Sequence, residues 1–166
     1  MKQKQLYSIG HGARKIHDFI DLLKKFGIGY VADVRSYPQS RFHPHFNRKA
    51  LEESLAAAGI TYLFMGDALG GRPNDKSCYV KDVIDYGKVA EKEFYRNGVK
   101  RLKTAFEKEL PVAIMCSERN PADCHRSRLI GKTLSTEGID LLHIDENGKL
   151  ASQKDVIART GNATLF

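Results

Sequence analysis

Two kinds of segment are missing from the sequence. No apolar run approaches the length that a helix needs to cross a bilayer, and the N-terminus, MKQKQLYSIG, lacks the apolar core of a secretory signal. Cysteine is also scarce, because only three are present, and an odd number does not suggest a disulfide framework. These absences disfavour a membrane protein and a secreted, disulfide-linked domain, so we expect a cytoplasmic protein in a reducing compartment.

What is present resembles a basic globular protein. The 166 residues are enough for a single α/β domain, 1–166, with its own hydrophobic core. Lysine and arginine exceed aspartate and glutamate, which gives a formal net charge of +7. Such an excess favours an anionic partner, either a phosphate-bearing small molecule or a nucleic acid. The glycines of GDALGGR, residues 66–72, match neither a dinucleotide-binding loop nor a P-loop, so no particular cofactor is predicted.

Strand-like and helix-like patterns alternate along the chain. The helical patterns are amphipathic, and Asn47 and Gly27 sit where a helix cap and a helix stop are expected. Residues 66–86 are rich in glycine and polar groups and are expected to form a long loop. The alternation predicts a three-layer α/β/α sandwich with a mostly parallel, doubly wound sheet of about five strands. The expected strands are 6–10, 30–36, 60–66, 111–116 and 139–144, and the expected helices are 16–27, 48–58, 88–108 and 121–137, with a short one in the C-terminal tail.

Chemically capable side chains follow the strands, whereas the opposite turns carry mostly glycine and small residues. In a doubly wound sheet, ligands bind beyond the carboxyl ends of the strands, near the point where strand order reverses. We therefore expect a shared site there. Its candidate residues are His11 after the first strand, Arg35, Ser36 and Arg41 after the second, Arg72 after the third, and Cys116 and Glu118 after the fourth.

The segment MCSERNPADCHRSR, residues 115–128, gathers two thiols, a histidine and several arginines. Asn120 followed by Pro121 is typical of a helix start, which would place His125 and Arg126 in the first two turns. Helix N-termini attract anions, and guanidinium groups bind phosphate in a bidentate fork. We expect the pKa of Cys116 to be lowered in this cationic setting, with His125 as its proton partner.

Each of these features also has a purely structural interpretation. Cys116 could be a small buried hydrophobe, and Cys124 is expected to pack against the sheet. Arg35 follows Asp33 by two positions, so the two could form a structural ion pair. In RFHPHFNR, residues 41–48, aromatic and basic side chains interleave as they do where bases stack. The alternative, which we favour there, is that Phe42 and Phe46 anchor the loop in the core. Cys78 lies in the polar loop and is read as incidental.

The spacing of the cysteines and their neighbours bears on three more specific kinds of site. The cysteine phosphatase loop requires arginine at the sixth position after cysteine, and counting from Cys116 that position is Ala122. A DVR segment on an early strand and a cysteine at a later strand end are typical of rhodaneses, but the compact loop after the cysteine is absent. A zinc site is conceivable but matches no finger spacing, and it ranks below an anion site. Its ligands would be Cys116, Cys124, His125 and His11.

Four segments, SIGHGARK, ADVRSYPQSR, LGGR and CSERNPADCHRSRLI, resemble those of the family catalogued as domain of unknown function 488. The resemblance extends in order from Ser8 to about Asp145. It implies an α/β fold and a polar cluster, but no established reaction. The positions that match the cluster are His11, Arg35, Arg41, Cys116, Cys124, His125 and Arg126.

Two hypotheses follow for the function. The first is a hydrolase or transferase acting on a phosphate-bearing substrate, such as a nucleotide or nucleic acid. The second is a non-catalytic module that binds a nucleotide or nucleic acid through the same basic cleft. Under the first hypothesis the catalytic groups are Cys116, His11 and His125, and the ligand-binding residues are Arg35, Arg41, Arg72, Arg126, Ser36 and Glu118.

Overall fold

The computed structural model describes the backbone of residues 3–163 and the side chains as far as residue 159. A six-stranded sheet forms the centre, with strand order β3-β2-β6-β1-β7-β8. The first five of these strands are parallel, and β8 pairs antiparallel with β7. The strands are β1 (Leu6–Gly10), β2 (Tyr30–Asp33), β3 (Thr61–Phe64), β6 (Val112–Cys116), β7 (Leu141–Ile144) and β8 (Leu150–Ala151).

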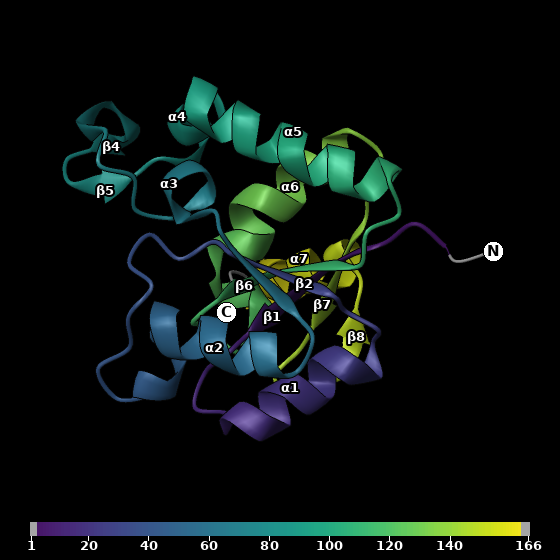
Figure 1. Ribbon diagram of the computed structural model, residues 1–166. Helices are drawn as coiled ribbons and strands as arrows, with labels where there is room; N and C mark the ends of the chain where they lie inside the picture. The colour runs from purple at the N-terminus through teal and green to yellow at the C-terminus, as the bar shows by residue number, and fades with distance from the viewer. Residues whose placement is uncertain (1–2, 164–166) are drawn as a thin grey trace.

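Helices cover both faces of the sheet. Helices α1 (Ile16–Lys25) and α2 (Arg48–Ala57) lie on one face, and α3 (Gly66–Leu69), α5 (Glu93–Glu107) and α6 (Lys132–Thr136) lie on the other (Figure 1). The last helix, α7 (Gln153–Ala163), packs against β7 and the segment that begins at Pro121. The predicted three-layer α/β/α sandwich with a doubly wound sheet is confirmed.

The alternation of side chains along β6 divides the core in two. Val112, Ile114 and Cys116 belong to the cluster under α5 and α6, whereas Ala113 and Met115 belong to the cluster under α1 and α2. Successive strand residues point to opposite faces, so this division follows from the sequence period alone. It also places the Cys116 thiol on the α6 side of the sheet.

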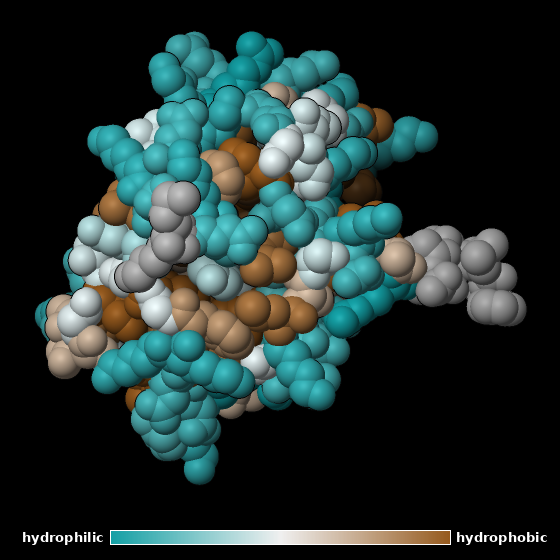
Figure 2. Space-filling model, turned by 90° about the vertical axis from the view of Figure 1, so that its right-hand side faces the viewer, coloured by the Kyte–Doolittle hydropathy of each residue, from teal (hydrophilic) through white to brown (hydrophobic). Residues whose placement is uncertain are grey.

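One face of the molecule shows how polar and apolar residues are distributed over the layers. Figure 2 views the molecule from the right-hand side of Figure 1 and shows hydrophilic residues over most of this face, with apolar residues visible between them. In helix α1, Phe19 and Leu23 are buried, and Gly27, with φ +68°, ends the helix as predicted. No helix in the described residues is long and apolar enough to span a membrane.

The segment 66–86 holds more structure than the predicted loop. It contains α3, a 3₁₀ turn at Lys76–Cys78, and an antiparallel ribbon of β4 (Tyr79–Val80) and β5 (Val83–Ile84). Cys78 is fully buried in the core beneath it, so it packs as a core residue although it lies in a polar stretch of sequence. The expected helix 88–108 is two helices, α4 (Tyr86–Ala90) and α5, because Lys92 between them has extended backbone, with φ −76° and ψ 142°.

The loop before α2 also differs from the expectation. Asn47 precedes the helix, but its side chain accepts a hydrogen bond from the Ser40 N–H at 2.7 Å and closes the loop instead of capping. Phe46 is buried and stacks on the His11 ring at 4.4 Å. Phe42, in contrast, is 82% exposed, so only one of the two expected phenylalanine anchors enters the core.

The expected helix 121–137 is interrupted near its start. The Asn120 side chain accepts a hydrogen bond from the Ala122 N–H, as predicted for a cap, but the turn it opens is a short 3₁₀ turn, Pro121–Asp123. Cys124 then has extended backbone, with φ −125° and ψ 151°. A π-helical segment, Arg126–Gly131, follows and continues into α6. The extended residue turns the Cys124 side chain away from the helical path.

Gly10 lies at the end of β1, in register with Cys116 on the neighbouring strand. A Cβ atom on Gly10 would lie 1.7 Å from the backbone oxygen of Glu118. Helices α1 and α6, which follow β1 and β6, lie on opposite faces, so the strand order reverses between these two strands. The close contact at Gly10 therefore holds the two loops together at the reversal point.

We predict that Gly10→Ala lowers the free energy of unfolding by at least about 2 kcal/mol, because the backbone of the 117–119 loop must move. Gly29→Ala is the matched control, since its Cβ would meet only Pro111 at an ordinary 3.5 Å. That control should stay within about 0.5 kcal/mol of the wild type. Urea unfolding measures both, and equal stabilities for the two variants would contradict the contact.

Candidate functional site

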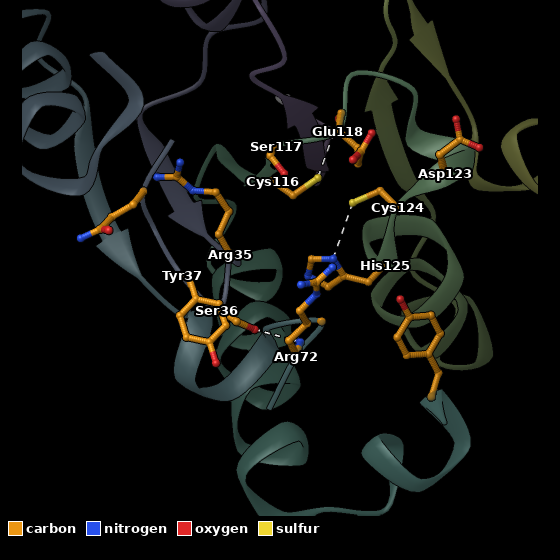
Figure 3. Close-up of a pocket in the computed structure, with 13 residues that line it drawn as sticks. Arg35, Ser36, Tyr37, Arg72, Cys116, Ser117, Glu118, Asp123, Cys124 and His125 are labelled. Carbon is orange, nitrogen blue, oxygen red and sulfur yellow. Dashed lines mark hydrogen bonds between the residues drawn. The ribbon is translucent and has the colours of Figure 1, made fainter. Parts of the chain in front are cut away.

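A cavity of about 390 Å³ opens at the carboxyl ends of β2 and β6 (Figure 3). Six of the predicted site residues line it, namely Arg35, Ser36, Arg72, Cys116, Glu118 and His125. The residues come from the loops after three different strands and from the segment after Pro121. The cavity thus lies beside the reversal point of the sheet, where a doubly wound fold places its ligands.

Three predicted site residues do not line the cavity. Arg41 is exposed on its loop, with its guanidinium 5.9 Å from the Phe42 ring. His11 is buried against Phe46, and Arg126 is buried completely beneath the thiols. The sequence placed all three correctly near strand ends, but it carries no signal for the direction of their side chains.

Cys124 and His125 form a pair at the cavity wall. The His125 Nε2 lies 3.0 Å from the Val34 carbonyl oxygen, which can only accept, so Nε2 carries the proton. The other ring nitrogen, Nδ1, is then a free acceptor 3.6 Å from the Cys124 Sγ. The Arg126 backbone N–H also points at this sulfur, at 3.5 Å. The thiol in contact with His125 is therefore that of Cys124, whereas the sequence suggested Cys116.

The pKa values of the two cavity thiols, Cys116 and Cys124, are shifted in opposite directions. Burial raises the pKa of the Cys116 thiol well above its ordinary value, and its hydrogen bond to Cys124 acts the same way. This is the reverse of the predicted lowering, because Cys116, at the strand end, is only 2% exposed. Burial also opposes the charged form of Cys124, yet its contacts with Cys116 and His125 and the charge of Arg126 lower the pKa of Cys124 well below its ordinary value.

The Arg126 guanidinium is fully buried and makes no ion pair with a carboxylate among the described residues. Its terminal nitrogens donate to the Ser8 hydroxyl at 2.9 Å and to the Glu118 carbonyl at 2.7 Å. Its Nε atom is buried with no hydrogen-bond partner among those residues. The acidic groups that act on its charge are the thiols of Cys116 and Cys124. Since a buried charge requires an opposite one, a thiolate is the natural counter-charge.

Residues 15–132 match the family model described as Domain of unknown function DUF488. This chain belongs to that family. The matched segment contains every residue that lines the cavity and also contains Arg126. No curated protein and no solved structure matches the chain.

A buried chain of hydrogen bonds holds Arg126 from behind in this DUF488 protein. The Ser8 hydroxyl lies 2.6 Å from His143 Nδ1, and His143 Nε2 lies 2.6 Å from the Gln153 side-chain oxygen. That oxygen can only accept, so Nε2 is protonated and Nδ1 accepts from Ser8. Gln153 in turn donates to the Ser127 carbonyl at 2.8 Å. The network joins β1, β7, α7 and the π-helical segment around one guanidinium, and sequence reasoning did not find it.

Arg35 forms the structural ion pair that was weighed as an alternative. Its Nε and terminal nitrogen donate to the two carboxylate oxygens of Asp33 at 2.9 and 2.8 Å. A further nitrogen lies 3.3 Å from His11 Nε2, and the Tyr62 hydroxyl donates to Asp33 at 2.6 Å. The His11 Nδ1 donates to the Gly12 carbonyl, so both of its ring nitrogens are engaged. Burial lowers the pKa of His11 to about 4, and the imidazole is therefore neutral at pH 7.

The cavity lining is less cationic than the sequence suggested. Arg35 is paired with Asp33, and the two carboxylates Glu118 and Asp123 also line the cavity. The Arg72 guanidinium makes no ion pair with any described residue, while its backbone N–H donates to the Ser36 hydroxyl at 2.9 Å. Arg72 is thus the cavity arginine with charge available to a ligand.

The residues weighed as a zinc site do not gather into one. Within residues 3–163 no group of three or more histidine, cysteine, aspartate or glutamate side chains is arranged to hold a metal ion. Both ring nitrogens of His11 are engaged, one by the Gly12 carbonyl and one by Arg35, so His11 is not available as the fourth ligand.

We predict that the buried His143 makes the protein less stable as the pH falls. Burial lowers the pKa of His143 to about 4. In the unfolded chain histidine binds a proton near pH 6.5. As the pH falls from 6.5 to 4, the free energy of unfolding therefore decreases by up to about 1.4 kcal/mol for each pH unit. The buried His11 adds a similar decrease over the same pH range, because burial also lowers its pKa to about 4.

His143→Gln should therefore lower stability at pH 7, because the Ser8 hydrogen bond is disturbed, and should also flatten the loss of stability toward pH 4. Urea unfolding across this pH range measures both effects. His17→Gln, on the exposed face of α1, should change neither. An unchanged pH slope in His143→Gln would show that this histidine is not the buried neutral group described above.

Proposed function

We propose that this protein is a cysteine-dependent hydrolase or transferase that acts on a phosphate-bearing substrate, with a nucleotide or nucleic acid as the substrate class. The observation that supports it most is the buried Arg126 beside two thiols, one of which is paired with a histidine at the wall of an open cavity. A site that only binds anions has no need of a buried cation that favours a thiolate, so this arrangement supports a reaction at the cysteine.

The Cys124 thiolate is the proposed nucleophile. His125 Nδ1 accepts the thiol proton, and the Val34 carbonyl holds the imidazole in the tautomer that permits this. The sulfur attacks the electrophilic centre of the substrate and displaces the leaving group, which takes the proton from the His125 imidazolium. Water, or a second acceptor in a transferase, then releases the bound group and regenerates the thiolate.

Arg72 is the proposed anchor for the negative charge of the substrate. Figure 3 shows the Arg72 side chain extending toward His125, on the side of the cavity opposite Cys116. A guanidinium that is free of other ion pairs can form a bidentate contact with a phosphate. Arg35 is held by Asp33 and supports the wall near the anion, while Tyr37 and Tyr86 offer aromatic surfaces on which a base can stack.

The second candidate is a non-catalytic module that binds a nucleotide or nucleic acid. Its support is the segment after β2, where Tyr37 is 64% and Phe42 is 82% exposed, with Arg41 beside Phe42. Exposed aromatics next to cations suit stacked bases and a phosphate backbone. Under this candidate Cys124 has no role in a reaction.

We predict that Arg72→Ala weakens the binding of nucleoside triphosphates at least about tenfold, which corresponds to the loss of one charge-assisted phosphate contact. Arg41→Ala, whose guanidinium lies outside the cavity, is the matched control and should bind mononucleotides as the wild type does. Isothermal titration calorimetry measures both. Equal affinity in the wild type and Arg72→Ala would contradict the proposed anchor.

The two candidates separate on Cys124→Ser. If the protein is an enzyme, this variant binds nucleotides with nearly unchanged affinity but releases no product from a panel of nucleotides and short single strands on which the wild type turns over. If the protein is a binding module, neither protein turns over and the substitution is silent. Loss of affinity without any wild-type turnover would count against the catalytic proposal.

A further inference from the structure

Cys116 has no role in the proposed reaction, yet its thiol lies directly beside the nucleophile. We propose that Cys116 and Cys124 form a reversible intramolecular disulfide, which makes the cavity a site of oxidation by hydroperoxides. The proposal shares the Cys124 thiolate with the proposed function, but it requires neither a bound substrate nor turnover.

The geometry brings these two sulfur atoms together from separate elements. Cys116 ends β6, and Cys124 follows the 3₁₀ turn with extended backbone. Figure 3 shows the two sulfur atoms facing one another at the cavity wall, and each thiol acts on the pKa of the other. Had the helix run on unbroken through Cys124, this side chain would follow the helical path instead.

The third cysteine, Cys78, belongs to the same buried cluster but does not line the cavity, and neither thiol of the pair is among the groups that act on its charge. Cys78 is buried in the core below α3, and the charges that act on it come from Asp75, Lys92 and Lys88. None of these belongs to the cavity wall around the thiols. Cys78 therefore serves as an internal reference that should stay reduced.

Cys116 and Cys124 are accessible to a small oxidant, and Cys124 has neighbours that favour its thiolate form. Cys116 and Cys124 line the open cavity, so a molecule as small as hydrogen peroxide can reach them. Thiolates, not thiols, react with peroxides, and Cys124 has the partners of a thiolate in His125, the Arg126 N–H and the Arg126 charge. Redox-sensitive cysteines of this kind are commonly placed next to a second, resolving cysteine.

The chemistry balances in two steps. The Cys124 thiolate attacks one peroxide oxygen, the O–O bond breaks, and the leaving hydroxide takes the proton held by His125 and departs as water. Cys116 then attacks the sulfur of the Cys124 sulfenic acid, so that an S–S bond forms and the S–O bond breaks. The second hydroxide leaves with the Cys116 proton, again as water. Two thiols and one hydroperoxide thus give one disulfide and two waters, and a dithiol reductant reverses the change by exchange.

The disulfide would remove the Cys124 nucleophile from the cavity. A protein with the proposed activity would then be switched off by hydroperoxide and restored by a dithiol. The oxidation itself is measured by mass, so its success or failure is separate from the success or failure of the proposed catalysis.

The experiment treats the reduced full-length protein with equimolar hydrogen peroxide and follows its intact mass. We expect a loss of about 2 Da, a cross-linked peptide pair containing Cys116 and Cys124, and a Cys78 thiol that is still alkylated after denaturation. Dithiothreitol should restore the starting mass. In Cys116→Ser the mass should instead rise by about 16 or 32 Da at Cys124, since no resolving thiol remains.

Cys124→Ser should react at least about tenfold more slowly than the wild type, whereas Cys78→Ser should form the disulfide as the wild type does. The wild-type result alone remains decisive if a variant fails to fold, which circular dichroism reports. The proposal is overturned if the wild type shows no mass loss, if the bond includes Cys78 or joins two chains, or if Cys124→Ser is oxidised as fast as the wild type.

Discussion

The buried charge of Arg126 is the constraint on which the site depends. A guanidinium enclosed between the sheet and the segment after Cys124 cannot remain uncompensated, yet its fixed partners, the Ser8 hydroxyl and the Glu118 carbonyl, are both neutral. The remaining acidic groups within its influence are the two thiols. Arg126 therefore favours ionisation of one thiol, and the hydrogen bonds around Cys124 select which one.

The fold supplies this arrangement through its topology. Parallel strands bring the loops after β1, β2 and β6 to one edge of the sheet, and the reversal of strand order between β1 and β6 leaves space for a cavity there. Gly10 allows the Glu118 backbone to approach closely, and the Ser8–His143–Gln153 hydrogen bonds secure Arg126 from the opposite side. The side chains of the candidate site are thus held by contacts with the central sheet and not by loops alone.

The sequence predicted the layered fold and the edge that carries the site, because both follow from the alternation of strands and helices. It did not predict side-chain direction. Nothing local distinguishes the extended backbone of Cys124 from a helical residue, so a helix was expected through it. The expected packing of Cys124 against the sheet agrees with its burial in the cluster that includes Ile114 and Cys116. Charge normally signals exposure, and for that reason the burial of Arg126 was not anticipated. The pairing of Arg35 with Asp33 was weighed correctly as an alternative, since period-two spacing puts both on one side of a strand.

The most direct test of the account is the ionisation of Cys124, followed by the ultraviolet absorbance of the thiolate as the reduced protein is titrated. The account predicts a thiolate signal at neutral pH in the wild type and in Cys78→Ser, and no such signal in Cys124→Ser. In Arg126→Gln the pKa of Cys124 should rise, so the thiolate signal should appear only at a higher pH than in the wild type. A wild-type protein whose three cysteines are all neutral thiols at pH 7 would contradict it, because the Arg126 charge would then have no counter-charge in the site.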